Sequence, residues 1–324
     1  MTVGEGFDEL QTKVDVPPDV MQVARRRRDL FRSTLPIAED VIEVFPSGSL
    51  ARGTHKDPLH DVDLVCVFDP VAHPDWGDPG PSPDEALGHL GSLINGFLGA
   101  DGTEGHEVRL VRKQNHALKC FMDDPDEEAP FTVDVTPALR HSERGLIIPE
   151  RKTQRWIRSD PEYLVERVAR RHSEWGQFAK MVRALKRWST DRETGMKSLV
   201  VEVLALEHLP ALDRPEALAK FFAAATNAVM DPVVDPAGLC GEIQPDLDRD
   251  AAREVIAKAA DSSWRAVDAF GRGEEAWAMC LWREVFGSIF PEPEGGCAKA
   301  KGAPALITAG LARPKRKIVD APQG

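Results

Sequence analysis

Two aspartates set one residue apart in an apolar run constrain this chain more than any other feature. The run DVDLVCVF occupies residues 61–68, and it predicts a strand, in which successive side chains point to opposite faces. Asp61 and Asp63 then share one face of that strand. Val62 and Leu64 share the other face, against a core. Neighbouring carboxylates repel one another unless a cation lies between them, and Mg²⁺ suits that position because it prefers carboxylate oxygens.

The segment before this strand has the features of a phosphate cradle. An apolar run, VIEVF, ends at Pro46, and Ser47-Gly48-Ser49 then turns the chain into LARGT, which can begin a helix. Gly48 lets backbone approach a ligand closely, and a helix N-terminus offers free N–H groups to an anion. The Ser49 hydroxyl adds another donor. The order strand, Gly-Ser turn, helix and Asp-x-Asp strand is more specific than either half alone.

A third carboxylate is expected on a neighbouring strand. In FTVDV, residues 131–135, Asp134 alternates with apolar side chains. Taken alone, such an aspartate could equally cap a strand end or pair with an arginine. Given Asp61 and Asp63, we expect Asp134 to complete a set of three acidic metal ligands.

The pattern of the whole chain predicts an α+β fold in three parts. Residues 1–150 mix helical stretches at about 18–33 and 84–98 with short β-rich runs. Between them, the Pro- and Gly-rich stretch at 70–83 is interpreted as a surface loop. Residues 151–291 show helical periodicity. The tail at 292–324 is rich in Pro, Gly, Ala and Lys, and we expect it to be flexible.

Composition limits the location and the partners. No apolar run reaches the roughly 18–20 residues that cross a bilayer, and the N-terminus lacks a signal pattern, so we expect a cytoplasmic protein that binds no membrane. A formal charge of −12 argues against broad nucleic-acid binding, which relies on positive charge. The arginines at 25–28, with Arg32, could form a local basic groove, or a solvated helix face as charge runs usually do.

The cysteines predict neither a zinc ribbon nor a disulfide framework. Their positions are far apart and none forms a C-x-x-C pair. We therefore expect all five to be small, reduced, hydrophobic side chains. They are Cys66, Cys120, Cys240, Cys280 and Cys297.

Gly48-Ser49, Asp61-x-Asp63 and the later Asp134 together resemble the DNA polymerase β-type nucleotidyltransferase superfamily. More narrowly, the chain resembles the CD-NTases, bacterial relatives of cyclic GMP–AMP synthase and oligoadenylate synthetase found in CBASS anti-phage systems. The resemblance covers most of residues 40–291 and implies a bilobal polymerase β-like core plus a helical C-terminal lobe like that of oligoadenylate synthetase. Further stretches that fit the family are GLIIPERKTQRWIRSDP (145–161), MVRALKRWS (181–189), MKSLVVEVLALE (196–207) and WREVFGSIFP (282–291).

This resemblance implies lobes at 1–150, with an N-terminal helix, and at 151–291. It also implies that two Mg²⁺ ions, replaceable by Mn²⁺, bind the three aspartates. Lys186 and Ser198 would contact the donor triphosphate together with Gly48 and Ser49. The alternatives are a solvated lysine and an N-capping serine. The product would be a cyclic di- or oligonucleotide, made from NTPs, that activates a separate effector in anti-phage defence.

The same residues are compatible with other functions and partners. The enzyme could instead modify an RNA, a small molecule or a protein, or the chain could be a non-catalytic nucleotide sensor or scaffold. Three mutually repelling carboxylates argue against the last alternative. The resemblance also suggests a regulatory CBASS partner, including a ubiquitin-transferase-like protein that would conjugate the chain through Gly324. A nucleic-acid activator is not indicated by the charge.

Overall fold

The computed structural model describes residues 1–99 and 107–300, which fall into two compact units. The sheet unit contains residues 16–169 and 235–241, and the helical unit contains residues 1–15, 170–234 and 242–300. Each is described separately below.

The sheet unit contains seven strands and four helical segments, and a further helix begins within it. In chain order these are α2 (Pro18–Thr34), η1 (Leu35–Ile37), β1 (Val41–Ser47), α3 (Gly48–Arg52), β2 (Asp61–Phe68), α4 (Ser82–Leu98), β3 (Leu110–Lys113), β4 (Leu118–Phe121), β5 (Thr132–Arg140), β6 (Leu146–Glu150), β7 (Arg155–Ser159) and the start of α5 (Pro161–Glu174).

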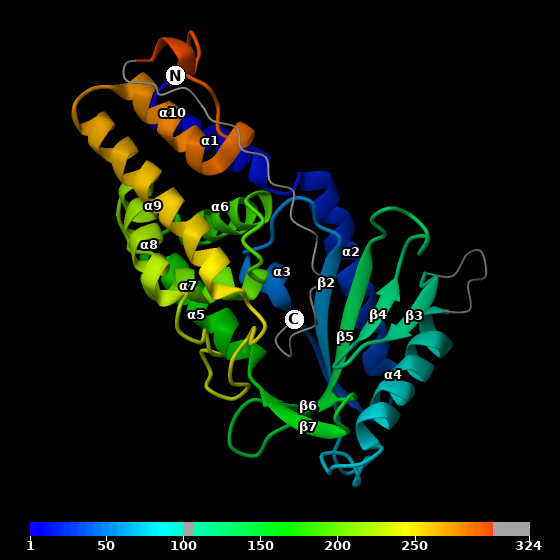
Figure 1. Cartoon of the computed structure of the whole chain (residues 1–324). Helices are drawn as coiled ribbons and strands as arrows, with labels where there is room; N and C mark the ends of the chain where they lie inside the picture. The colour runs from blue at the N-terminus through cyan, green and yellow to red at the C-terminus, as the bar shows by residue number, and fades with distance from the viewer. Residues whose placement is uncertain (100–106, 301–324) are drawn as a thin grey trace. The chain divides into compact units, whose positions relative to one another are not determined.

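The strands form one mixed sheet in the order β1-β2-β5-β4-β3. β2 and β5 run parallel, and the other pairs are antiparallel. The end of β5 also pairs with β6, and β6 pairs in turn with β7. The predicted α+β class is therefore confirmed, with the sheet and helices shown in Figure 1.

The two faces of β2 divide as the alternation predicts. Val62 and Leu64, with Cys66 and Phe68, join the main core that α2 and α4 contribute to. On the opposite face, the later residues of β2 pack in a smaller cluster with residues of β5 and β6. Asp61 and Asp63 lie on this second face, nearer the start of the strand. Burial of the first face fixes the register, because a slip by one residue would exchange the faces.

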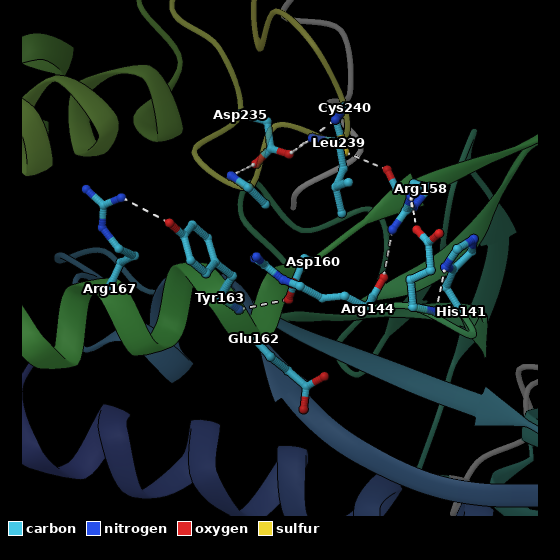
Figure 2. A network of polar contacts seen from close by, with 12 residues as sticks. His141, Arg144, Arg158, Asp160, Glu162, Tyr163, Arg167, Asp235, Leu239 and Cys240 are labelled. Atoms are coloured by element: carbon cyan, nitrogen blue, oxygen red, sulfur yellow. Dashed lines mark hydrogen bonds and ion pairs between the residues drawn. The ribbon is translucent and has the colours of Figure 1, made fainter.

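A short loop far along the chain, residues 235–241, belongs to the sheet unit (Figure 2). The Asp235 carboxylate accepts the backbone N–H groups of Leu239 and Cys240 at 3.0 and 3.2 Å. The Cys240 thiol donates to the carbonyl oxygen of Arg158, on β7, at 2.8 Å. These contacts close the loop on itself and join it to the strand.

Beside that loop, a second polar cluster fixes the entry into α5 (Figure 2). The Asp160 carboxylate accepts the backbone N–H of Tyr163 at 2.9 Å and the Arg144 guanidinium at 2.6 Å. Arg144 also lies 4.2 Å from the centroid of the Tyr163 ring. The first helical residues after β7 are therefore tied to the turn between β5 and β6.

The helical unit is built from α1 (Val3–Val14), the end of α5, α6 (Phe178–Asp191), α7 (Ser198–His208), α8 (Arg214–Ala228), α9 (Arg249–Gly271), α10 (Glu275–Phe286), η2 (Gly287–Ile289) and η3 (Cys297–Lys299). Figure 1 shows this predominance of helices. The sequence predicts α6, α7, α9 and α10 closely.

Helix α1, which is not predicted from the sequence, lies in this unit, whereas the expected helix at about 18–33 is α2 of the sheet unit. Thr2 and Glu5 form a capping box that begins α1. The Phe7 ring then packs edge-on against Trp282 and Phe290, with centroids 5.0 and 5.2 Å away. Residues 151–169, expected in the helical lobe, lie in the sheet unit because β7 completes the strand pairing there.

The loop at residues 70–83 lies mostly at the surface, as its composition predicts, but it differs from a loose excursion because ring contacts anchor it. His73 and Trp76 stack at 3.8 Å, and both rings meet Phe68 edge-on. The last two residues of the stretch, Ser82 and Pro83, already belong to α4 and are buried. Aromatic packing on the end of β2 explains the difference, since Gly and Pro content says nothing about the rings between them.

The arginines at 25–28 do not form one continuous basic groove. The first two are exposed on α2. Arg27 instead donates two hydrogen bonds to Asp123, and its guanidinium lies 4.8 Å from the centroid of the Phe131 ring. Burial acts to raise the pKa of the Asp123 carboxyl, but its hydrogen bonds with Arg27 and the Phe131 N–H hold that pKa below its usual value. Arg27 is thus structural, which interrupts the run.

The cysteine expectation is correct for two side chains and wrong for another pair. Cys66 and Cys120 are buried thiols whose pKa is raised, first by burial and then by a nearby carboxylate. Cys280 and Cys297 form a disulfide with a Cα–Cα distance of 5.6 Å. Their sequence separation of 17 matches no short motif, so the pairing needed the fold that brings η3 to α10. Among the described residues, no helix has the length and apolar character required to cross a membrane.

The disulfide predicts a specific thiol count. Wild-type protein, unfolded in guanidinium without reductant, should expose three titratable thiols, Cys66, Cys120 and Cys240. Cys297→Ser should lower the free energy of unfolding by up to about 3 kcal/mol, as expected for a loop of this size. Adding reductant should destabilise the wild type and leave this variant unchanged. Five thiols in unreduced wild type would refute the pairing.

Candidate active site

Sheet register brings the three predicted aspartates onto one face. Asp63 on β2 and Asp134 on β5 are direct partners in the parallel ladder, and neighbouring strands lie about 4.8 Å apart. Asp61 lies two residues before Asp63 and therefore on the same face. Asp61 is exposed, whereas Asp63 and Asp134 are half-buried. Alternation of apolar and polar residues in the sequence predicts which face each aspartate occupies. The strand register, which alternation cannot predict, makes Asp63 and Asp134 neighbours.

The backbone of Gly48 lies directly against the carboxylate of Asp63. Gly48 has φ +65°, a left-handed conformation that favours glycine. A Cβ at this position would lie 1.7 Å from Oδ2 and 2.4 Å from Cγ of Asp63. Both the backbone conformation and the available space therefore require glycine here. The sequence predicts that Gly48 allows a close approach to a phosphate. In the structure, the group that lies against Gly48 is the carboxylate of Asp63.

Ser49 lies in α3, which contains only five residues and follows the last residue of β1 directly. Ser47 is the cap residue and makes no side-chain capping hydrogen bond. Ser47 is also the ladder partner of Asp63. The predicted order of strand, Gly-Ser turn and helix is thus present, with a helix too short to carry a large dipole.

A lysine that the sequence analysis does not single out lies across the ladder from Asp134. Lys119 on β4 is its register partner, and the Nζ of Lys119 lies 3.8 Å from Oδ2 of Asp134. Lys119 is about one-third exposed. Its charge offsets part of the repulsion among the three carboxylates. The signal was present in LKCF, where Lys119 alternates with buried Leu118 and Cys120.

Lys186 is buried inside the helical unit and is not a solvated lysine. It projects from α6, is 3% exposed, and its Nζ lies 2.5 Å from Oε2 of Glu202 on α7, which is 0% exposed. Removing one partner of a buried ion pair typically costs about 3–5 kcal/mol, because the other charge is left uncompensated. Glu202 is the partner that the sequence reasoning missed, since it sits in a run that is otherwise apolar.

Ser198 is the first residue of α7, as predicted, and it is exposed. The cap residue is Lys197, not Ser198, so the N-capping alternative is wrong. The contact of Lys186 and Ser198 with a triphosphate stays a prediction. Both lie in the helical unit, while the aspartates lie in the sheet unit.

The donor set of the sheet unit fits divalent magnesium. Three carboxylates on one sheet face supply the hard oxygen ligands that Mg²⁺ prefers. Glycine beside Asp63 leaves room at that carboxylate where any side chain would collide. The residues present therefore suit a divalent cation, and manganese has the same preference for oxygen ligands.

The comparisons agree with this site. The nucleotidyltransferase domain family matches residues 22–136, a span that includes all three aspartates. This part of the chain therefore resembles a nucleotidyltransferase domain. A curated relative, a probable cyclic nucleotide synthase of Bacillus cereus (strain VD146), is 24% identical over 340 residues, covering 90% of this chain and 99% of the relative.

Solved structures locate the fold more narrowly. The structure of CdnC from E. coli MS115-1 with ATP superposes with a TM-score of 0.67 at 18% identity, covering 90% of this chain and 99% of that one. The complex of the same enzyme with HORMA-deltaN gives 0.65 at 18% identity, covering 89% and 98%. The chain thus has the fold of these structures, and the resemblance inferred from the sequence is confirmed.

The contact between Gly48 and Asp63 predicts a large effect of one methyl group. Gly48→Ala should lower nucleotidyl transfer by about 100-fold or more, since displacing a catalytic group by about 1 Å has that effect. Gly53→Ala is the matched control, because Gly53 has φ +68° but a Cβ there meets nothing within 4 Å. Both variants should lose about 1–2 kcal/mol of stability through the left-handed backbone. Equal activity of the two would contradict the assignment.

Proposed function

We propose that the protein joins NTPs into a cyclic di- or oligonucleotide, with Asp61, Asp63 and Asp134 as the catalytic metal ligands. The observation that carries the proposal is the register pairing of Asp63 with Asp134, with Asp61 on the same face. The whole-length similarity to a probable cyclic nucleotide synthase supports the choice of product.

Each site residue of the sheet unit would have a role in this reaction. Asp61, Asp63 and Asp134 would hold two magnesium ions, which supply charge neutralisation and a lowered pKa of the attacking hydroxyl when bound. Gly48 leaves room for the Asp63 carboxylate, and its backbone would approach the donor phosphates. Ser49 would donate its hydroxyl to those phosphates. Positioning and electrostatic stabilisation supply most of the catalysis in phosphoryl transfer.

Lys119 fits the same scheme as a residue that acts through Asp134. Its ammonium group reduces the repulsion at the carboxylates before cations bind. With a ribose hydroxyl as acceptor, a linear intermediate would form first, and a second transfer would close the ring. Lys186 and Ser198 would position the triphosphate from the helical unit.

The similar structures also suggest which molecules the protein binds. The structure of CdnC with ATP supports NTP as substrate here, and its complex with HORMA-deltaN supports a regulatory protein partner. A separate effector activated by the product belongs to the same proposal, as does a role in anti-phage defence. Gly324, the predicted conjugation point, lies outside the described residues, so conjugation stays a prediction.

The two kinds of reaction differ in whether they require an added acceptor. An enzyme that modifies RNA, a small molecule or a protein needs that acceptor, whereas a cyclic product forms from NTPs alone. The net charge of −12 disfavours RNA. A scaffold without activity is disfavoured by the three carboxylates themselves.

The test is incubation of the full chain with the four NTPs and Mg²⁺, followed by phosphatase treatment and mass spectrometry. We expect a phosphatase-resistant product whose mass corresponds to a ring. Asp61→Asn combined with Asp63→Asn should abolish product while leaving the thermal midpoint near that of wild type. Asp126→Asn, an exposed carboxylate of the sheet unit, should retain activity. Only phosphatase-sensitive linear products, or transfer that requires an added acceptor, would contradict the proposal.

A further inference from the structure

Three potential metal ligands from separate segments converge at the far end of β2. Asp40 immediately precedes β1, His73 lies in the loop after β2, and His89 projects from α4. The Nε2 atoms of His73 and His89 lie 2.8 and 2.6 Å from the same oxygen, Oδ2, of Asp40. All three side chains are half-buried.

Aromatic packing fixes the orientation of both imidazoles. His73 stacks on Trp76 with ring centroids 3.8 Å apart and an interplanar angle of 15°. Phe68 meets His73 and His89 edge-on at 5.6 and 5.5 Å. Rings held in this way present their nitrogens to one point with little freedom left to lose, which is how good ligand sets are arranged.

The chemistry of the donors differs from that of the active site. Two imidazoles and one carboxylate form a recurrent zinc ligand set that leaves a fourth position for water. Imidazole selects zinc and its neighbours in the first transition row over magnesium. The three ligand atoms lie within 4.8 Å of one another. Nitrogen and oxygen ligands about 3.3 Å apart would surround a tetrahedral zinc, so each Nε2 would have to move away from Oδ2 by roughly half an ångström for the ion to enter.

A purely hydrogen-bonded cluster is the alternative, because both Nε2 atoms lie within hydrogen-bond distance of Oδ2 of Asp40. The same convergence of two ring nitrogens and one carboxylate oxygen is also what a metal ion requires. Zinc titration therefore distinguishes the two.

The cluster is separate from the three catalytic carboxylates. It adjoins Phe68, on the face of β2 that packs with α2 and α4, whereas Asp61 and Asp63 occupy the opposite face. Five residues separate Asp63 from Phe68, a rise of about 16 Å along a strand. The two sites thus differ in face, in position along β2 and in ligand type.

We propose that Asp40, His73 and His89 bind one Zn²⁺ ion that ties the loop at 70–83 and helix α4 to the start of β1. The ion would cross-link these segments and take no part in nucleotidyl transfer, since the site lies far from Asp61 and Asp63. The loop has no strand or helix before Ser82. The zinc ion would therefore add a cross-link to it.

Zinc binding by the tag-free full chain tests the proposal. Protein stripped with a chelator is titrated with Zn²⁺ against a chromophoric competitor, in millimolar Mg²⁺. We expect one equivalent in wild type, a raised thermal midpoint, and affinity at least about tenfold weaker in His73→Gln and His89→Gln. His208→Gln, on α7 of the other unit, is the matched control and should bind as wild type does. Co²⁺ should give visible absorption bands that His89→Gln loses.

The Asp61→Asn/Asp63→Asn variant separates this site from the catalytic one. It should keep its zinc equivalent. Loss of zinc in that variant with retention in His73→Gln would move the ion to the active site and overturn the proposal. Wild-type protein that is folded by circular dichroism yet binds no zinc or cobalt at tenfold excess would overturn it as well.

Discussion

The proposed active site depends on holding three carboxylates together on one face of a sheet against their mutual repulsion. Nothing about Asp61, Asp63 and Asp134 favours their proximity by itself. The opposite face of β2 holds them there, because Val62 and Leu64 are fully buried and a one-residue slip would expose them. Gly48 leaves the space that the carboxylate of Asp63 occupies, and Lys119 offsets part of the charge. The hydrophobic core thus stabilises an arrangement that electrostatics disfavours until cations bind.

The helical unit meets a related problem in a different way. Lys186 and Glu202 are both buried and form an ion pair within the unit. Such a pair contributes little net stability compared with apolar side chains of similar volume, yet losing one member is costly. An activity loss on substituting Lys186 would therefore report folding as well as the predicted phosphate contact, and Glu202→Gln is the comparison that separates the two effects.

Sequence periodicity predicts much of the fold and the three aspartates, and the misses have physical causes. Alternation in DVDLVCVF and FTVDV places each aspartate on a face, but pairing of Asp63 with Asp134 comes from the parallel register, which no local pattern encodes. Lys119, Glu202 and the Cys280–Cys297 disulfide depend on partners far along the chain. The aromatic loop around His73 is missed because Gly and Pro content conceals long-range ring packing.

The most direct test of the account is a crystal structure with Mn²⁺ and a non-hydrolysable NTP, since manganese is located by its anomalous scattering. The account predicts anomalous peaks within ligand distance of carboxylate oxygens of Asp61, Asp63 and Asp134, with the triphosphate bridging them near Gly48 and Ser49. Nucleotide bound elsewhere, or manganese absent from these three side chains while nucleotide is bound, would contradict it.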